Sequence, residues 1–259
     1  MGVKSMEYTN EKIKNAASLE ELFALWKNKP ATTVIVHNKK KQEDMEVTVD
    51  HSGVFISDGA ICPEIWNDRT TGKKIAFVLK EAYGEAEDWS LTEWLRRTGP
   101  GANIWYRVVE WVYGMLNTTA ERIARYSPEK ISFEKSEDKP NELLSKIAIV
   151  NLKKSGGKSS SDYDEIMACA LADREEIVRE LEILNPDVIV CGSTAEALNN
   201  ICGGFMELKK CDNWYYYSDA IGGRERLFID YYHPASRYPT LLNYYGLVNI
   251  YQQALLEKE

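Results

Sequence analysis

The chain has 259 residues, a formal net charge of -8 at pH 7 and 44% hydrophobic residues. This length suits one large domain, and the acidic charge argues against a protein that coats nucleic acid over its whole surface, since phosphate contacts need Lys and Arg. The longest apolar runs are strand-sized, far short of the roughly 20 residues that span a bilayer. With no apolar signal at the start and five irregularly spaced cysteines, we expect a cytoplasmic monomer with free thiols and no membrane association.

Residues 1–70 are predicted to form an N-terminal extension that contains a helix and a hairpin. Ser18 followed by Glu21 is a capping-box pattern, and apolar residues recur after it at helical spacing. We expect this helix to end near Pro30.

The hairpin is indicated by two alternating segments, residues 33–36 and 46–49, with a charged turn between them. No residue of the extension is expected to be catalytic. His37 and His51 are expected at the surface.

Residues 71–259 are predicted to form the main domain, in which apolar strands alternate with helices. The expected strands are residues 75–79, 147–150, 188–190 and 227–230, and one long helix is expected over 162–184, stopped by Asn185-Pro186. This alternation predicts a three-layer αβα fold with a central, largely parallel sheet. Ligands of such sheets bind beyond the carboxyl ends of the strands.

The segments that follow these strands are therefore the candidates for a site. They are Lys80-Glu-Ala-Tyr-Gly, Asn151-Leu-Lys-Lys-Ser, Cys191-Gly-Ser-Thr and Tyr231-Tyr-His-Pro-Ala-Ser-Arg. The second segment, continued to residue 161, is expected to be a flexible, glycine-containing loop, in which Lys153, Lys154 and Lys158 form either a local anion site or an ordinary solvated surface.

In order and spacing, these segments resemble the uracil-DNA glycosylase superfamily, from about residue 73 to 256. Residues 80–84 are similar to the G-E-A-P-G motif of its iron–sulfur branch, with Lys80 and Tyr83 as departures. Ala82 stands where another branch has a water-orienting aspartate. His233-Pro-Ala-Ser-Arg is similar to the H-P-S segment, which begins the loop that wedges into DNA.

The resemblance implies roles for these residues. Asn151 would read uracil, because an amide can accept from N3–H and donate to O4, although an asparagine after a strand is also an ordinary turn residue. His233 would donate to uracil O2 as charge develops, and Glu81 would assist water or sugar. The remaining candidates are Tyr83, Trp89 and Trp94 for stacking, Ala82 at the altered motif position, and Lys153, Lys154, Ser236 and Arg237 for phosphates.

No metal or other cofactor is expected. Only Cys169 falls on a ligand position of the iron–sulfur branch, with Ser155 at another, and four thiolates are the usual requirement. Cys169 is therefore interpreted as a buried residue on the apolar face of a helix.

These expectations define three functional alternatives. The first is a DNA-repair hydrolase that flips a base, uracil in particular, from single- or double-stranded DNA and cleaves its N-glycosidic bond. The second is an inactive nucleic-acid or nucleotide-binding module of the same fold. The third is a doubly wound enzyme that acts on a free nucleotide or sugar.

Overall fold

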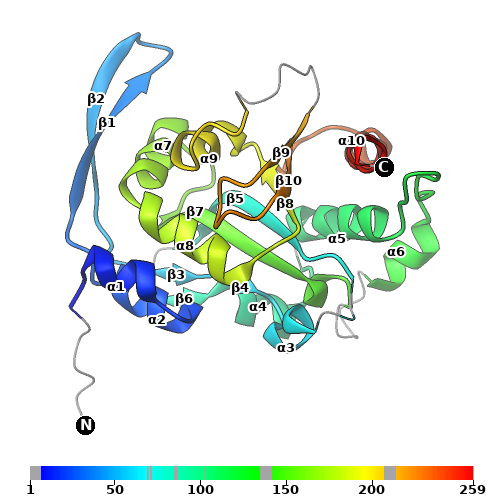
Figure 1. Cartoon of the computed structure of the whole chain (residues 1–259), viewed down its shortest axis with the longest axis horizontal. Coiled ribbons are helices and arrows are strands. Elements are labelled where there is room, and N and C mark those ends of the chain that lie inside the picture. Colours follow the sequence, from blue (N-terminus) through cyan, green and yellow to red (C-terminus); the bar gives the residue numbers. More distant parts are fainter. Residues whose placement is uncertain are drawn as a thin grey trace.

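The computed structural model describes residues 7–68, 70, 72–84, 87–101, 103–134, 142–206 and 214–258. Its centre is a six-stranded sheet in the order β4-β7-β5-β8-β10-β9 (Figure 1). The inner strands β7, β5, β8 and β10 are parallel, and β4 and β9 are antiparallel edge strands. The bounds are β4 (Gly59–Ala60), β5 (Ile75–Tyr83), β7 (Ile147–Gly157), β8 (Val188–Gly192), β9 (Tyr215–Ser218) and β10 (Arg226–Tyr231). The four predicted strands are thereby confirmed.

Helices cover both faces of this sheet, because alternate side chains of the strands are apolar on both sides. Ala76 and Val78 face one core, and Phe77 and Leu79 face the other. The first core includes α1 (Asn10–Asn15), α2 (Leu19–Trp26), α3 (Pro63–Asn67), α7 (Tyr163–Ala172), α8 (Arg174–Leu184) and α9 (Ala195–Ile201). The second includes α4 (Leu91–Thr98), α5 (Asn103–Leu116), α6 (Pro128–Glu134), η2 (Leu144–Lys146) and α10 (Thr240–Glu257). The mixed α/β architecture with helices on either side of a mostly parallel sheet is as predicted.

The N-terminal segment contributes to the first core. Ser18 caps α2 as predicted, since its Oγ accepts from the Glu21 amide at 3.2 Å, whereas Glu21 Oε2 accepts from the amide of Ala17, one residue before the cap, at 2.9 Å. The hairpin of β1 (Thr32–Asn38) and β2 (Glu43–Val49) packs on α7, and its tip projects from the body (Figure 1). Further on, β3 (Ile56–Ser57) pairs with β6 (Trp89–Ser90), and β4 joins the central sheet.

Two predictions are corrected, one for His51 and one for the helix over residues 162–184. His51 is buried, with 1% of its surface exposed. Its Nε2 lies 2.9 Å from Asp173 Oδ2, and this hydrogen bond offsets the cost of burying a polar ring. The expected helix over 162–184 is two helices, α7 and α8, which meet at Asp173. The Asp173 carboxylate is also 3.1 Å from Lys29 Nζ, so this residue is tied to the N-terminal segment where the helix breaks.

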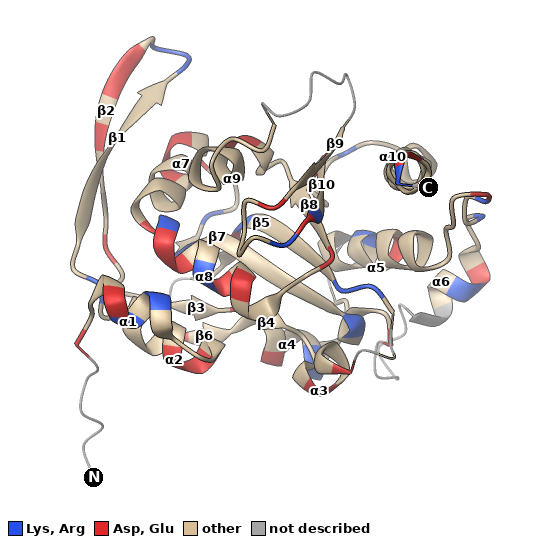
Figure 2. Ribbon diagram, in the orientation of Figure 1, with Lys and Arg blue, Asp and Glu red and all other residues tan. Residues whose placement is uncertain are grey.

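None of the helices that the structure describes is both long enough and apolar enough to cross a membrane. Acidic and basic residues are interspersed over the ribbon (Figure 2). On the hairpin they form two short runs, with Lys39, Lys40 and Lys41 at the tip followed by Glu43 and Asp44 on β2.

Candidate functional site

A cavity of about 890 Å³ lies at the carboxyl end of the parallel strands. The chain passes from β5 to β7 on one side and then returns to β8 on the other side of β5, and such a reversal of strand order opens a crevice for ligands. The predicted site residues that line this cavity are Glu81, Ala82, Tyr83, Trp89, Trp94, Asn151, His233 and Ser236. Residues far apart in the sequence are thus brought to one place.

The end of β5 supplies a carboxylate that is already paired. Glu81 Oε2 lies 3.0 Å from Lys153 Nζ, and Lys153 is also 2.8 Å from Glu165 Oε1 on α7. Burial disfavours the charged form of Lys153, but the hydrogen bonds that its amine donates to Glu165 and Glu81 outweigh this effect and raise its pKa. Lys153 therefore neutralises Glu81 and is not available to hold a phosphate, which corrects the prediction for this residue.

Asn151, within β7, is buried except where it meets the cavity. Its backbone N–H and its side-chain Nδ2 both donate to Asp58 Oδ2, at 2.7 and 3.1 Å. Asp58 precedes β4 in a part of the chain where no catalytic role was expected. No sequence pattern marks this aspartate, because its partner lies on a strand 93 residues away.

Lys154 is the second corrected phosphate candidate. Its side chain is fully buried, 2.5 Å from Asp58 Oδ1 and 2.8 Å from Glu180 Oε2. Its segment is also not a flexible loop, since β7 continues to Gly157. The positions beyond the strand, Lys158 and residues 159–161, line the cavity instead.

His233 follows β10 in a turn that is fixed by hydrogen bonds. Its backbone N–H donates to Ser193 Oγ at 2.9 Å, and the Ala235 N–H donates to its Nδ1 at 3.2 Å. Burial, with a smaller effect of the Lys80 charge, lowers the pKa of His233 to about 4. The ring is therefore neutral at pH 7, and because Nδ1 accepts a hydrogen bond, its proton is on Nε2.

Aromatic rings form one wall. Trp89 and Trp94 are in edge contact, with ring centroids 6.4 Å apart, and Trp105 of α5 joins them. The sequence did not single out Trp105 from its tryptophan-rich neighbourhood. Tyr83 also lines the cavity and is 72% exposed, so it is the ring that solvent reaches most easily.

Arg237 and Cys169 are two further residues that the sequence singles out. Arg237 is exposed and is not among the lining residues, whereas Ser236 beside it is. Cys169 is buried on α7, and burial, followed by the Asp173 charge, raises the pKa of its thiol to about 12. Its interpretation as a core residue is confirmed.

Within the ranges described above, no group of three or more His, Cys, Asp or Glu residues is arranged to hold a metal.

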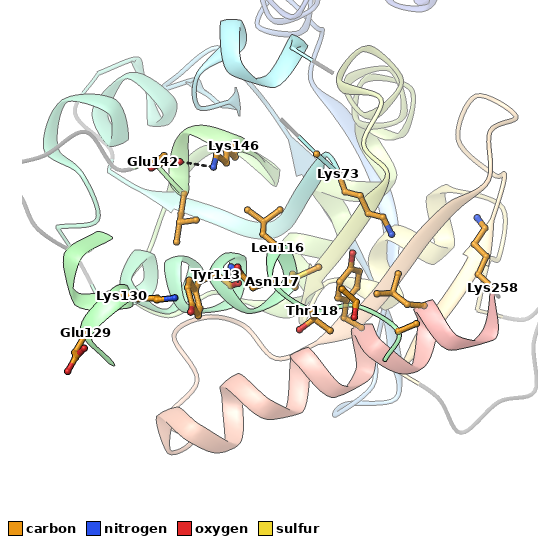
Figure 3. A pocket seen from close by; sticks show the side chains of 17 residues that line it. Lys73, Tyr113, Leu116, Asn117, Thr118, Glu129, Lys130, Glu142, Lys146 and Lys258 are labelled. Atoms are coloured by element: carbon orange, nitrogen blue, oxygen red, sulfur yellow. Dashed lines mark hydrogen bonds and ion pairs between the residues drawn. The ribbon is translucent and has the colours of Figure 1, made fainter. Parts of the chain in front are cut away.

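A larger cavity, of about 1120 Å³, lies near the amino ends of β5 and β7 (Figure 3). Four lysines line it, of which Lys146 pairs with Glu142 at 2.9 Å and Lys258 with Glu225 at 2.6 Å. We place the functional site at the smaller cavity, because it lies at the strand ends where open α/β sheets bind ligands and because a neutral histidine and a fixed amide meet there.

Comparison with known proteins gives no family for this chain. No family model matches it, and no curated protein does. Inference about its function therefore depends on the site itself.

Proposed function

We propose that the protein is a uracil-DNA glycosylase-like hydrolase, which extrudes a base from DNA and cleaves its N-glycosidic bond. The observation that carries the proposal is that Glu81 of β5, Asn151 of β7 and His233 beyond β10 line one aromatic cavity. These are the residues for which the family resemblance implies a role.

Base recognition is assigned to Asn151. Its amide matches uracil, which offers N3–H as a donor and O4 as an acceptor, whereas cytosine has the opposite polarity at both atoms. The cavity wall formed by Trp89, Trp94 and Trp105 provides apolar surface for a flipped base.

Stabilisation of the departing base is assigned to His233. The neutral ring donates from Nε2 to the uracil oxygen on which negative charge develops, and such a donor acts mainly in the transition state. The nearby Lys80 charge, which helps to keep the ring neutral, also favours an anionic leaving group.

Glu81 is assigned to the water or sugar. Its Oε2 is held by Lys153, while its Oε1 is buried and accepts no hydrogen bond from the described residues. A buried acceptor of this kind requires a partner, which a water molecule or a sugar hydroxyl would provide.

The segment that follows His233 carries exposed apolar side chains. Leu241 and Leu242, in the first turn of α10, are 53% and 67% exposed, and Tyr238 and Tyr245 lie close to them in sequence. In the family that the sequence resembles, this is the loop that wedges into DNA. Side chains of this type can fill the space that an extruded base leaves in the duplex.

One observation favours a second candidate, a binding module that recognises the base without cleavage. Ala82 replaces the aspartate that orients water in another branch of the family. The acidic residue among the described lining residues, Glu81, is already paired with Lys153. Both features weaken activation of water and leave base recognition intact.

The two candidates are separated by an assay on single- and double-stranded oligonucleotides that carry one uracil, with cytosine and thymine oligonucleotides as controls. Alkaline strand cleavage at the abasic site detects release of uracil, and a gel shift detects retention. Release supports the hydrolase, and retention without release supports the binding module. If neither occurs and free nucleotides bind instead, both candidates are wrong.

A further inference from the structure

Asp58 is hydrogen-bonded to Asn151, the residue to which base recognition is assigned. Its Oδ2 accepts from the backbone N–H of Asn151 at 2.7 Å and from Asn151 Nδ2 at 3.1 Å. Both residues are buried, with 5% and 2% of their surfaces exposed. The contact is therefore part of the interior and shielded from competing water.

This contact fixes which way the Asn151 amide points. A carboxylate only accepts hydrogen bonds, so the nitrogen of the amide, and not its oxygen, must lie against Asp58. The nitrogen Nδ2 and the oxygen Oδ1 of Asn151 lie on opposite sides of the amide carbon. None of the described residues donates a hydrogen bond to Oδ1. The cavity therefore receives the oxygen as a free acceptor, together with the second Nδ2 hydrogen as a donor.

Lys154 holds the carboxylate in place from its other side. Its Nζ is 2.5 Å from Asp58 Oδ1 and 2.8 Å from Glu180 Oε2, and all three side chains are fully buried. Burial, followed by the Asp58 charge, raises the pKa of Glu180 well above its usual range. The buried amine of Lys154 thus lies between two carboxyl groups, which a charge in the interior requires.

We infer that Asp58, held by Lys154, is a positioning residue that orients the Asn151 amide and thereby selects bases with a lactam edge, in which a ring N–H lies beside a carbonyl. Uracil and hypoxanthine have this edge, and cytosine and adenine do not. The inference rests on the proposed role of Asn151 in reading the base. It does not require cleavage.

The test compares two variants of the same buried cluster. Asp58→Asn removes the carboxylate that touches Asn151, and the new side chain can donate as well as accept, so the Asn151 amide is no longer held in one orientation. Glu180→Gln removes an acid that does not touch Asn151 and is the matched control. For each folded variant, affinity is measured for short single strands that contain one deoxyuridine or one deoxycytidine.

We expect Asp58→Asn to lower the preference for deoxyuridine by about tenfold or more, through weaker uracil binding and stronger cytosine binding, because specificity is a difference of two affinities. Glu180→Gln should keep the preference within about twofold. A folded Asp58→Asn protein that keeps its preference overturns the inference. Equal loss in both variants also overturns it, because the effect would then be general to the cluster.

A measurement on the unaltered protein covers the case in which Asp58→Asn does not fold. In ¹⁵N spectra, one Asn151 side-chain hydrogen should exchange slowly because Asp58 holds it, and the other should become protected only when the deoxyuridine strand is added. Fast exchange of both hydrogens, or equal binding of deoxyuridine and deoxycytidine, overturns the inference. If the protein prefers deoxyuridine but never releases uracil, the proposed cleavage fails and the role of Asp58 stands.

Discussion

His233 differs from a surface histidine because the fold keeps its ring neutral. Its pKa falls from an ordinary 6.5 to about 4, so the folded state resists protonation more than the unfolded chain does. The resulting stability is complete above pH 6.5 and is lost as the pH falls towards 4. Since one pKa unit corresponds to about 1.4 kcal/mol, full titration would remove about 3 kcal/mol.

The first prediction follows from this shift. Between pH 7 and pH 4, wild type should lose up to about 3 kcal/mol more unfolding free energy than His233→Gln, whose side chain does not titrate. Urea denaturation at several pH values measures the difference. Parallel pH dependence in the two proteins would show that His233 is solvated in the folded state.

The second prediction concerns the two residues that would act on the base. Asn151→Asp should slow uracil release roughly ten- to a hundredfold, because a carboxylate cannot donate to O4. His233→Ala should slow it by roughly a hundredfold or more, since the lost donor acts where charge develops. Single-turnover assays of uracil release measure both rates, and thermal melts confirm folding.

Lys130→Gln is the control for these variants, because Lys130 lines the other cavity. It should release uracil at the wild-type rate. If Asn151→Asp and His233→Ala, both folded, also do so, the cavity is not where the reaction takes place.

At the scale of the elements, the break between α7 and α8 shows how the N-terminal segment is bound to the sheet domain. Asp173 caps both helices and lies against Lys29 and His51, all three in the interior. The backbone of Asp173 is non-helical, with φ of -105° and ψ of 24°, at the residue whose carboxylate makes these N-terminal contacts. Packing of distant segments thus decides where one helix ends and the next begins.

The third prediction follows from this arrangement. Asp173→Ala should lower the free energy of unfolding by about 3–5 kcal/mol, because removal of one partner leaves Lys29 buried beside fewer opposite charges. Glu196→Gln, which breaks the exposed pair with Lys39, should change it by less than about 1 kcal/mol. Urea denaturation of both variants measures the contrast, and similar small losses in the two would show that the Asp173 cluster is solvated.

The sequence predicts the elements best where apolar patterning alone determines them. The strands at residues 75–79, 147–150, 188–190 and 227–230 are buried runs, and each was predicted. The continuation of β7 from Asn151 to Gly157 was not, because its polar residues are typical of a loop. These residues are buried only because carboxylates from distant parts of the chain, such as Glu81 and Asp58, meet their charges.

Contacts between distant parts of the chain also limit how far the site could be predicted. Asn151 and His233 could be predicted because each follows an apolar strand within a family-like motif. Asp58 could not, because its importance comes from a contact with a strand far along the chain. Lys153 and Lys154 were predicted to hold phosphates because their segment was expected to be a flexible loop, and only the structure shows that each charge is paired with a carboxylate inside the protein.

At the scale of the whole molecule, the proposal of a polyanionic partner must be reconciled with a net charge of -8. Charges of both signs are interspersed along the chain (Figure 2). Near the cavity, Lys80 and Lys158 line the wall and Arg237 is exposed beside Ser236. DNA would therefore be held by a few local contacts, and not by a broad basic surface.

The last prediction is that binding to a single strand depends only weakly on salt. Each phosphate contact on single-stranded DNA contributes about -0.7 to the slope of log affinity against log salt concentration, so two or three contacts give a slope between about -1.4 and -2.1. Lys158→Gln should make the slope shallower by about 0.7 if Lys158 provides one of these contacts. Lys130→Gln, at the other cavity, should leave it unchanged. Fluorescence anisotropy of a labelled deoxyuridine strand at several salt concentrations measures the slopes. A wild-type slope near zero excludes contact with the phosphate backbone, and equal slopes for wild type and Lys158→Gln remove Lys158 from the binding surface.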